Sequence, residues 1–147
     1  MLLNQTLLIA TLFAAPPTSD QVKAVFDYHY QGQGQELVLA DAVLCKTIEK
    51  KDKARKNDCA ETYGSSAAKG DTVLVYLTGV LPKGAKTELM IQAVHEGVVR
   101  TTKDVTLEGK YIRARTWKGF GLRKTGAWEF RIIQGSKTIR TLKLNAS

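Results

Sequence analysis

TVLVYLTGVL, at residues 72–81, is the stretch that decides the fold. Val, Leu and Tyr follow one another closely enough for a strand at the centre of a sheet. Pro82-Lys83-Gly84 ends the run, and Pro and Gly are residues that favour a tight turn. A dense apolar strand closed by a turn predicts β structure for this part of the chain.

Strand patterns continue on both sides of residues 72–81. The next two, 87–95 and 98–107, flank Glu96-Gly97, which predicts a two-residue hairpin because Gly adopts positive φ at little steric cost. Further strands are expected at residues 37–48, 111–117, 128–133 and 137–144. These seven strands, with no convincing amphipathic helix after Gln35, predict an all-β, antiparallel, immunoglobulin-like two-sheet sandwich. A closed barrel is the main alternative.

The chain has 147 residues, which fits one domain. Leu7–Ala15, LLIATLFAA, is an apolar run of nine, whereas a membrane-spanning helix takes about 20 residues. The run is typical of a signal peptide, although no Lys or Arg precedes it and Pro16 follows it. We therefore expect residues 1–19 to be a signal peptide and spacer; a buried strand or a misassigned start codon are the alternatives.

Residues 20–36 are expected to be an N-terminal extension, and residues 37–147 the sandwich domain. Within the extension, residues 22–30 fit both the alternation of a strand and the stripe of a helix. Thr18 and Gln21 have the spacing of a capping box, which would favour a helix. The pattern leaves the choice between helix and strand open.

Two cysteines, Cys45 and Cys59, are expected to form a disulfide, because they are even in number and leave no thiol over. Closing a loop of this size stabilises a fold by about 3 kcal/mol in the chain-entropy model. In a cytosolic protein the same pair would be two buried thiols. Together with the apolar run, the pair predicts a periplasmic or secreted protein.

The formal net charge is +8, from 22 Lys and Arg against 14 Asp and Glu. Such a balance favours anionic partners, and it also serves to keep a small domain soluble. The first of two basic segments lies between the cysteines, and its candidate binding residues are Lys50, Lys51, Lys53, Arg55 and Lys56. It predicts either a solvated hairpin tip or an electrostatic footprint held rigid by the disulfide.

The second basic segment runs from Lys110 to Lys124. Alternation places Arg113, Arg115 and Trp117 on one face of a strand, and Lys118 follows them as a further candidate. A basic face that ends in an aromatic ring predicts a site that binds phosphates or sugars. Alternatively, Trp117 packs into the edge of the core while the arginines reach solvent.

Catalytic patterns are weak. The two histidines, His29 and His95, have no Ser or Cys partner in a recognisable motif, and His95 is expected at a surface or strand edge. The cysteine spacing is not that of a zinc or redox site. Gly119-Phe120-Gly121 lacks the third glycine of a phosphate loop and is expected to be a turn between strands. We expect no enzyme activity, no cofactor and no metal.

The turns and aromatics from Ala42 to Leu144 resemble the bacterial family called domain of unknown function 2914. The features that carry the resemblance are Ala42-Val43-Leu44, Gly70-Asp71-Thr72-Val73, Glu96-Gly97, Arg113 and Thr125-Gly126-Ala127-Trp128 with Phe130. The resemblance implies a small β domain of the cell envelope with no established activity. The chain departs from the family in its cysteine pair and in Gln92 and Val94, where the family places a His-x-Trp pair.

These observations predict a non-catalytic, exported envelope module that binds a protein partner or acts as a scaffold through its edge strands and exposed side chains. The alternative is a binding module for an anionic polymer: an acidic glycan, a lipid headgroup or, least expected, nucleic acid. Salt-sensitive binding through Arg113, Arg115 and Trp117 is what would distinguish it. We expect no transmembrane segment in the mature chain.

Overall fold

A computed structural model describes residues 18–23, 37–109 and 113–147. The predicted signal peptide up to residue 17, His29, and most of the ambiguous segment lie outside the described residues. Residues 19–23 form one helical turn closed by a capping box, in which the Thr18 and Gln21 side chains each accept the other's backbone amide, at 3.2 and 2.9 Å. Within the described ranges, no helix is long and apolar enough to cross a membrane.

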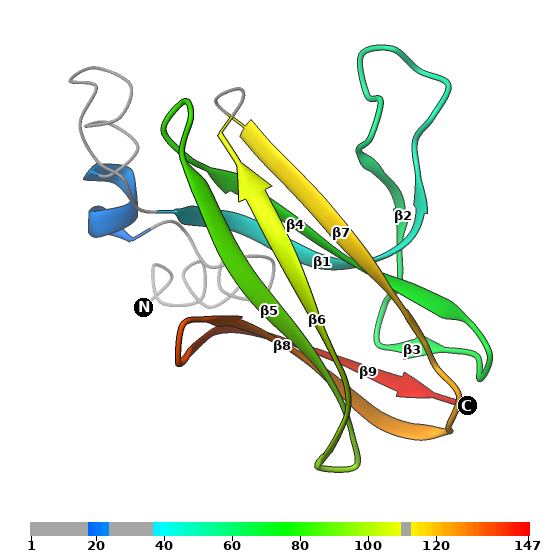
Figure 1. Cartoon of the computed structure of the whole chain (residues 1–147). Coiled ribbons are helices and arrows are strands. Elements are labelled where there is room, and N and C mark those ends of the chain that lie inside the picture. The colour runs from blue at the N-terminus through cyan, green and yellow to red at the C-terminus, as the bar shows by residue number, and fades with distance from the viewer. Residues whose placement is uncertain (1–17, 24–36, 110–112) are drawn as a thin grey trace, which may run out of the picture.

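In the described part of the chain, nine strands form two sheets that pack face to face (Figure 1). The first sheet has the order β2-β1-β4-β7 and the second the order β3-β9-β8-β5-β6. The bounds are β1 Val38–Ile48, β2 Cys59–Thr62, β3 Ser66–Ala67, β4 Thr72–Val80, β5 Lys86–His95, β6 Val98–Glu108, β7 Arg113–Gly121, β8 Gly126–Gln134 and β9 Lys137–Ala146. The predicted immunoglobulin-like sandwich is thus confirmed, and two separate sheets exclude the barrel.

The core lies between the sheets and follows the alternation of the strands. Val73, Val75 and Leu77 of β4 are fully buried on one side, and Trp128, Phe130 and Ile132 of β8 are buried on the other. Burying a side chain of this size stabilises a fold by roughly 1.5–3 kcal/mol. The sandwich therefore rests mainly on the strands that the apolar patterns identify.

The predicted turns are confirmed by their backbone. Glu96 and Gly97 both have positive φ, 47° and 79°, as a two-residue hairpin with a primed turn requires. Gly135, with a φ of 62°, turns the chain between β8 and β9. Gly84, with a φ of 86°, turns it after β4.

Two short strands were not predicted from the sequence patterns. β2 has four residues and β3 has two, and neither has an apolar alternation of its own. β3 also runs parallel to β9, in a sandwich whose other strand pairs are antiparallel. Among the residues that the structure describes, the sandwich therefore has nine strands instead of the expected seven.

Two local expectations are wrong. Gly119-Phe120-Gly121 is not a turn, because β7 continues to Gly121 and pairs with β4 along its whole length. Phe120 lies in the core, with its ring 5.5 Å from that of Phe130. His95 is not a surface residue, since only 8% of it is exposed and its ring packs against Trp128 at 4.9 Å.

Candidate functional site

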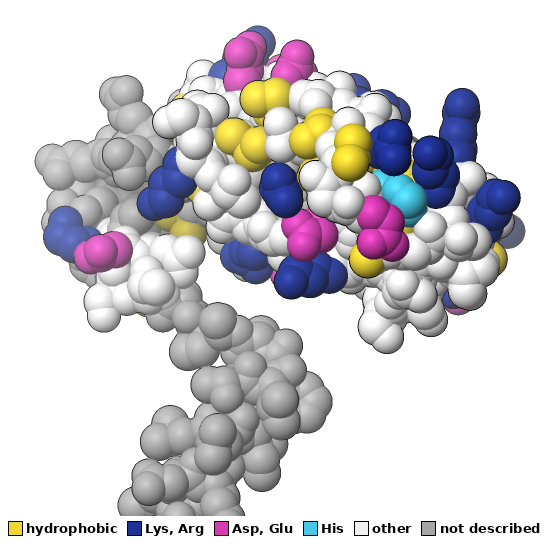
Figure 2. Space-filling model, turned by 90° about the horizontal axis from the view of Figure 1, so that it is seen from below, with side chains coloured by type: hydrophobic (Ala, Val, Ile, Leu, Met, Phe, Trp, Pro, Cys, Tyr) yellow, Lys and Arg dark blue, Asp and Glu magenta, His cyan; other side chains and the backbone are white. Residues whose placement is uncertain are grey.

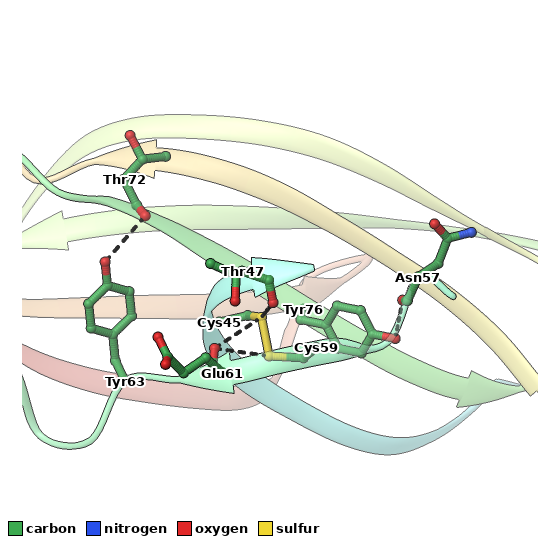
Figure 3. Close-up of a disulfide and its surroundings, with 8 residues drawn as sticks. All are labelled: Cys45, Thr47, Asn57, Cys59, Glu61, Tyr63, Thr72 and Tyr76. Carbon is green, nitrogen blue, oxygen red and sulfur yellow. Dashed lines mark hydrogen bonds between the residues drawn. A yellow bond between two sulfur atoms is a disulfide. The ribbon is translucent and has the colours of Figure 1, made fainter. Parts of the chain in front are cut away.

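Cys45 and Cys59 form the predicted disulfide, which joins β1 to the start of β2 (Figure 3). Their Cα atoms are 5.9 Å apart, and Cys45 is fully buried. The two strands also pair directly, with Ile48 opposite Cys59 and Cys45 opposite Thr62. The disulfide thus closes a hairpin whose connecting segment, residues 49–58, we call the stapled loop.

Backbone hydrogen bonds give the stapled loop a defined shape. The Glu49 amide donates to the carbonyl of Asp58, and the Asn57 amide donates to the carbonyl of Glu49, both at 2.8 Å. Asn57 has a φ of 68°, a left-handed conformation that Asn tolerates better than most residues. The loop is therefore closed at its base by hydrogen bonds as well as by the disulfide.

Each of the three carboxylates of the stapled loop has a partner within the protein. Glu49 accepts the Lys51 amide at 2.8 Å and the Asp52 amide at 3.3 Å, and these hydrogen bonds, chiefly that from Lys51, hold the Glu49 pKa below its ordinary value. Asp52 accepts the Ala54 amide at 3.0 Å. Asp58 forms ion pairs with the arginines of β7.

The base of the loop is fastened to the outer face of the first sheet. The Tyr76 hydroxyl donates to the Asn57 carbonyl at 2.9 Å, as Figure 3 shows. Burial raises the Tyr76 pKa above its ordinary value, so the phenol keeps the proton that it donates. Trp117 pairs with Tyr76 across the strands and stacks on it, with ring centroids 5.9 Å apart. Tyr76, supported by Trp117, therefore holds the base of the loop.

The predicted binding residues fall into two groups. Lys50, Lys51, Lys53, Arg55 and Lys56 are all exposed, and none forms an ion pair within the described part of the chain. Arg113 and Arg115 share a face with Trp117, as predicted, but both are paired with Asp58 of the stapled loop. The two basic segments, far apart in the sequence, thus meet on one face of the first sheet.

Lys118 does not belong to that face. It pairs with Val75, a residue of the core, and so lies on the opposite side of β7 from Arg113, Arg115 and Trp117. Because β7 is an edge strand, the side chain is nevertheless exposed.

A basic cleft that the sequence did not reveal lies at the open edge between the sheets. It has a volume of about 440 Å³, and the residues that line it are Ala93, Arg100, Thr101, Lys103, Phe120, Gly121, Arg123, Lys124 and Trp128. We refer to Arg100, Lys103, Arg123 and Lys124 as the cleft cations. One signal was available: alternation puts Lys103 on the same face of its strand as Val105 and Leu107, where a cation is unexpected.

No group of three His, Cys, Asp or Glu side chains suited to a metal ion occurs in the described ranges. The described residues thus offer two basic features as candidate sites, the stapled loop and the cleft cations.

No protein-family model matches the chain, and no curated protein matches it. Among solved structures, it is similar to an immunoglobulin-like protein from Pseudomonas aeruginosa, with a TM-score of 0.49 and 8% identity over 76% of this chain and 97% of that chain. It is also similar to part of a β-glucosidase from Listeria innocua, with a TM-score of 0.48 and 12% identity over 92% of this chain but 21% of that chain. Neither similarity bears on activity.

Proposed function

We propose that this chain is an exported, non-catalytic β-sandwich that binds a protein partner in the cell envelope, and that the stapled loop is its contact. The observation that carries the proposal is the orientation of charge in the loop. Its three carboxylates accept backbone amides or pair with the β7 arginines, whereas its five cations are exposed and form no ion pair among the described residues. Such a loop fits an acidic surface on the partner.

The rigid base of the loop supports this proposal. A flexible loop loses conformational entropy when it binds, and pre-organisation removes much of that cost. Here the disulfide, the Tyr76 hydrogen bond and the Asp58 ion pairs fix both ends of the loop before any partner arrives. The disulfide also favours export, because disulfides persist in oxidising compartments and are rare in the cytosol.

The anionic-polymer alternative loses support at the residues on which it was based. Arg113 and Arg115 are already paired with Asp58, and one face of the Trp117 ring is occupied by Tyr76. Such a ligand would have to displace Asp58 and release the base of the loop. The resemblance to domain of unknown function 2914 stays a prediction.

Photo-crosslinking in cells tests the proposal. A benzophenone side chain is placed at Ala54, in the stapled loop, and a matched control at Lys137, also an exposed position, at the start of β9. We expect one discrete crosslinked protein from Ala54 and none from Lys137, with the product lost when Lys51, Lys53 and Arg55 are changed to Glu. Equal products at both positions, or a product that survives charge reversal, would overturn the proposal.

Export is tested separately by fractionation of cells that produce the full chain. We expect the protein in the envelope or medium, with Cys45 and Cys59 protected from alkylation until a reductant is added. A cytosolic protein with two reactive thiols would contradict export, whatever the crosslinking shows.

A further inference from the structure

We propose that the basic cleft is a second binding site, separate from the stapled loop, for a multiply charged phosphate- or sulfate-bearing ligand. The cleft lies where β6, the edge of the second sheet, faces β7, the edge of the first. Lys103 crosses this gap. Its ammonium donates to the Gly119 carbonyl of β7 and lies 4.9 Å from the centre of the Phe120 ring.

The cleft cations have no carboxylate partners within the described residues. Three other arginines of the sandwich do have carboxylate partners: Arg131 is paired with Glu129, and Arg113 and Arg115 with Asp58. The neighbouring Glu96 does not compensate the cluster by an ion pair, and its carboxylate accepts the Ala127 amide at 2.9 Å. Four like charges around one cleft repel one another, and a bound anion would remove that repulsion.

Figure 2 shows several Lys and Arg side chains gathered at one end of the molecule, around the small visible part of a histidine side chain. At this end, two buried side chains hold the segment that carries Arg123 and Lys124. The Trp128 indole donates to the Lys124 carbonyl at 2.9 Å, and the His95 Nε2 lies 2.7 Å from the Thr125 carbonyl, which requires Nε2 to carry its proton.

The start of this segment, at Leu122, is also held in place. Leu122 is fully buried, and its amide donates to the Asp71 carbonyl at 2.9 Å. The flanking strands β7 and β8 and the rings of Trp128 and His95 therefore fix the backbone of Arg123 and Lys124. A pre-organised site loses less entropy on binding than a mobile one.

The geometry of the cleft indicates the class of ligand. Its volume lies within the range of small-molecule sites, about 300–1,000 Å³. A single carboxylate would pair with one arginine and leave the other cations uncompensated. A phosphate or sulfate group offers several oxygens that two guanidinium forks and two ammonium groups can share. Phe120 and Trp128 are nearly buried, so charge and not ring stacking would supply the affinity.

Such a group can come from a free phosphorylated compound or from a sulfated or phosphorylated glycan chain, and calorimetric titration of the full oxidised chain distinguishes the two. Pyrophosphate and a heparin-derived hexasaccharide are the probes, and trigalacturonate is the carboxylate control, all at about 150 mM salt. We expect at least one probe to bind and trigalacturonate to bind at least about tenfold more weakly. Preference for pyrophosphate indicates a free compound, and preference for the hexasaccharide indicates a glycan.

Variants locate the site. The double variant Arg123→Ala with Lys124→Ala is expected to lower the affinity for the probe by about tenfold or more, because each change removes a charge-assisted hydrogen bond. The matched control, Lys83→Ala with Lys137→Ala, removes the same charge from exposed positions outside both the cleft and the stapled loop and should leave the affinity unchanged. All four positions are exposed, so both variants are expected to fold.

Three results would overturn the proposal: no binding of either soluble probe, equal weakening by the two double variants, or binding confined to anionic phospholipid vesicles. Equal weakening would mean that the net charge of +8 acts without a site. Because crosslinking from the stapled loop depends on different residues, loss of one proposal leaves the other standing.

Discussion

Trp128→Ala is the substitution that tests the architecture most directly. The indole is 4% exposed, packs against His95 and Phe130, and donates to the Lys124 carbonyl. Burial of about 200 Å² at 25 cal/mol/Å² sets an upper bound of about 5 kcal/mol, and Trp→Ala changes in cores cost about 3–5 kcal/mol. Domains are stable by about 5–15 kcal/mol, so the variant should remain folded but marginal.

Urea unfolding provides the measurement, because Trp117, the second tryptophan, remains as a fluorescent reporter in the variant. With a slope of about 2 kcal/mol/M, a loss of 3–5 kcal/mol lowers the midpoint by about 1.5–2.5 M. Trp128→Phe serves as the control: it keeps the ring but loses the indole hydrogen bond, and should cost about 1–2 kcal/mol. A loss below about 1 kcal/mol for Trp128→Ala would refute the packing described and with it the register of β8.

Three further predictions concern the stapled loop. Changing Cys45 and Cys59 to Ala should lower the free energy of unfolding by about 3 kcal/mol, measured by urea denaturation, while circular dichroism still reports the sandwich. Asp58→Asn should cost less than about 1 kcal/mol because the ion pair is near the surface, yet hydrogen exchange of the Asn57 amide should quicken; an unchanged rate would mean that the pair does not hold the loop. The Glu49 pKa is lowered in the folded protein, so its hydrogen bond from the Lys51 amide is fully formed above the ordinary pKa of 4.5. This hydrogen bond is lost as the pH falls through the lowered pKa. NMR should show the Lys51 amide shift changing in that acidic window, and Glu49→Gln should abolish the change.

The candidate site was only partly accessible from the sequence. The pairing of Cys45 with Cys59 followed from their number, and the exposure of the lysines between them followed from their polarity. The ion pairs of Arg113 and Arg115 with Asp58 did not, because these residues are more than fifty positions apart and meet only when the loop closes over β7. The basic cleft was hidden because its cations come from β6 and from the segment after β7, which the sandwich brings together.

The sequence by itself determined the elements that depend on local chemistry. Alternating apolar residues specified seven strands, and glycines with positive φ specified the turns at Gly84, Gly97 and Gly135. Tertiary structure decided what depends on neighbours. Strand β3 exists because β9 offers it hydrogen-bond partners, and β7 extends to Gly121 because β4 pairs with it and Phe120 packs in the core. The charge of each lysine and arginine was visible in the sequence, but whether a carboxylate neutralises it is settled only by which strands and loops the fold brings together.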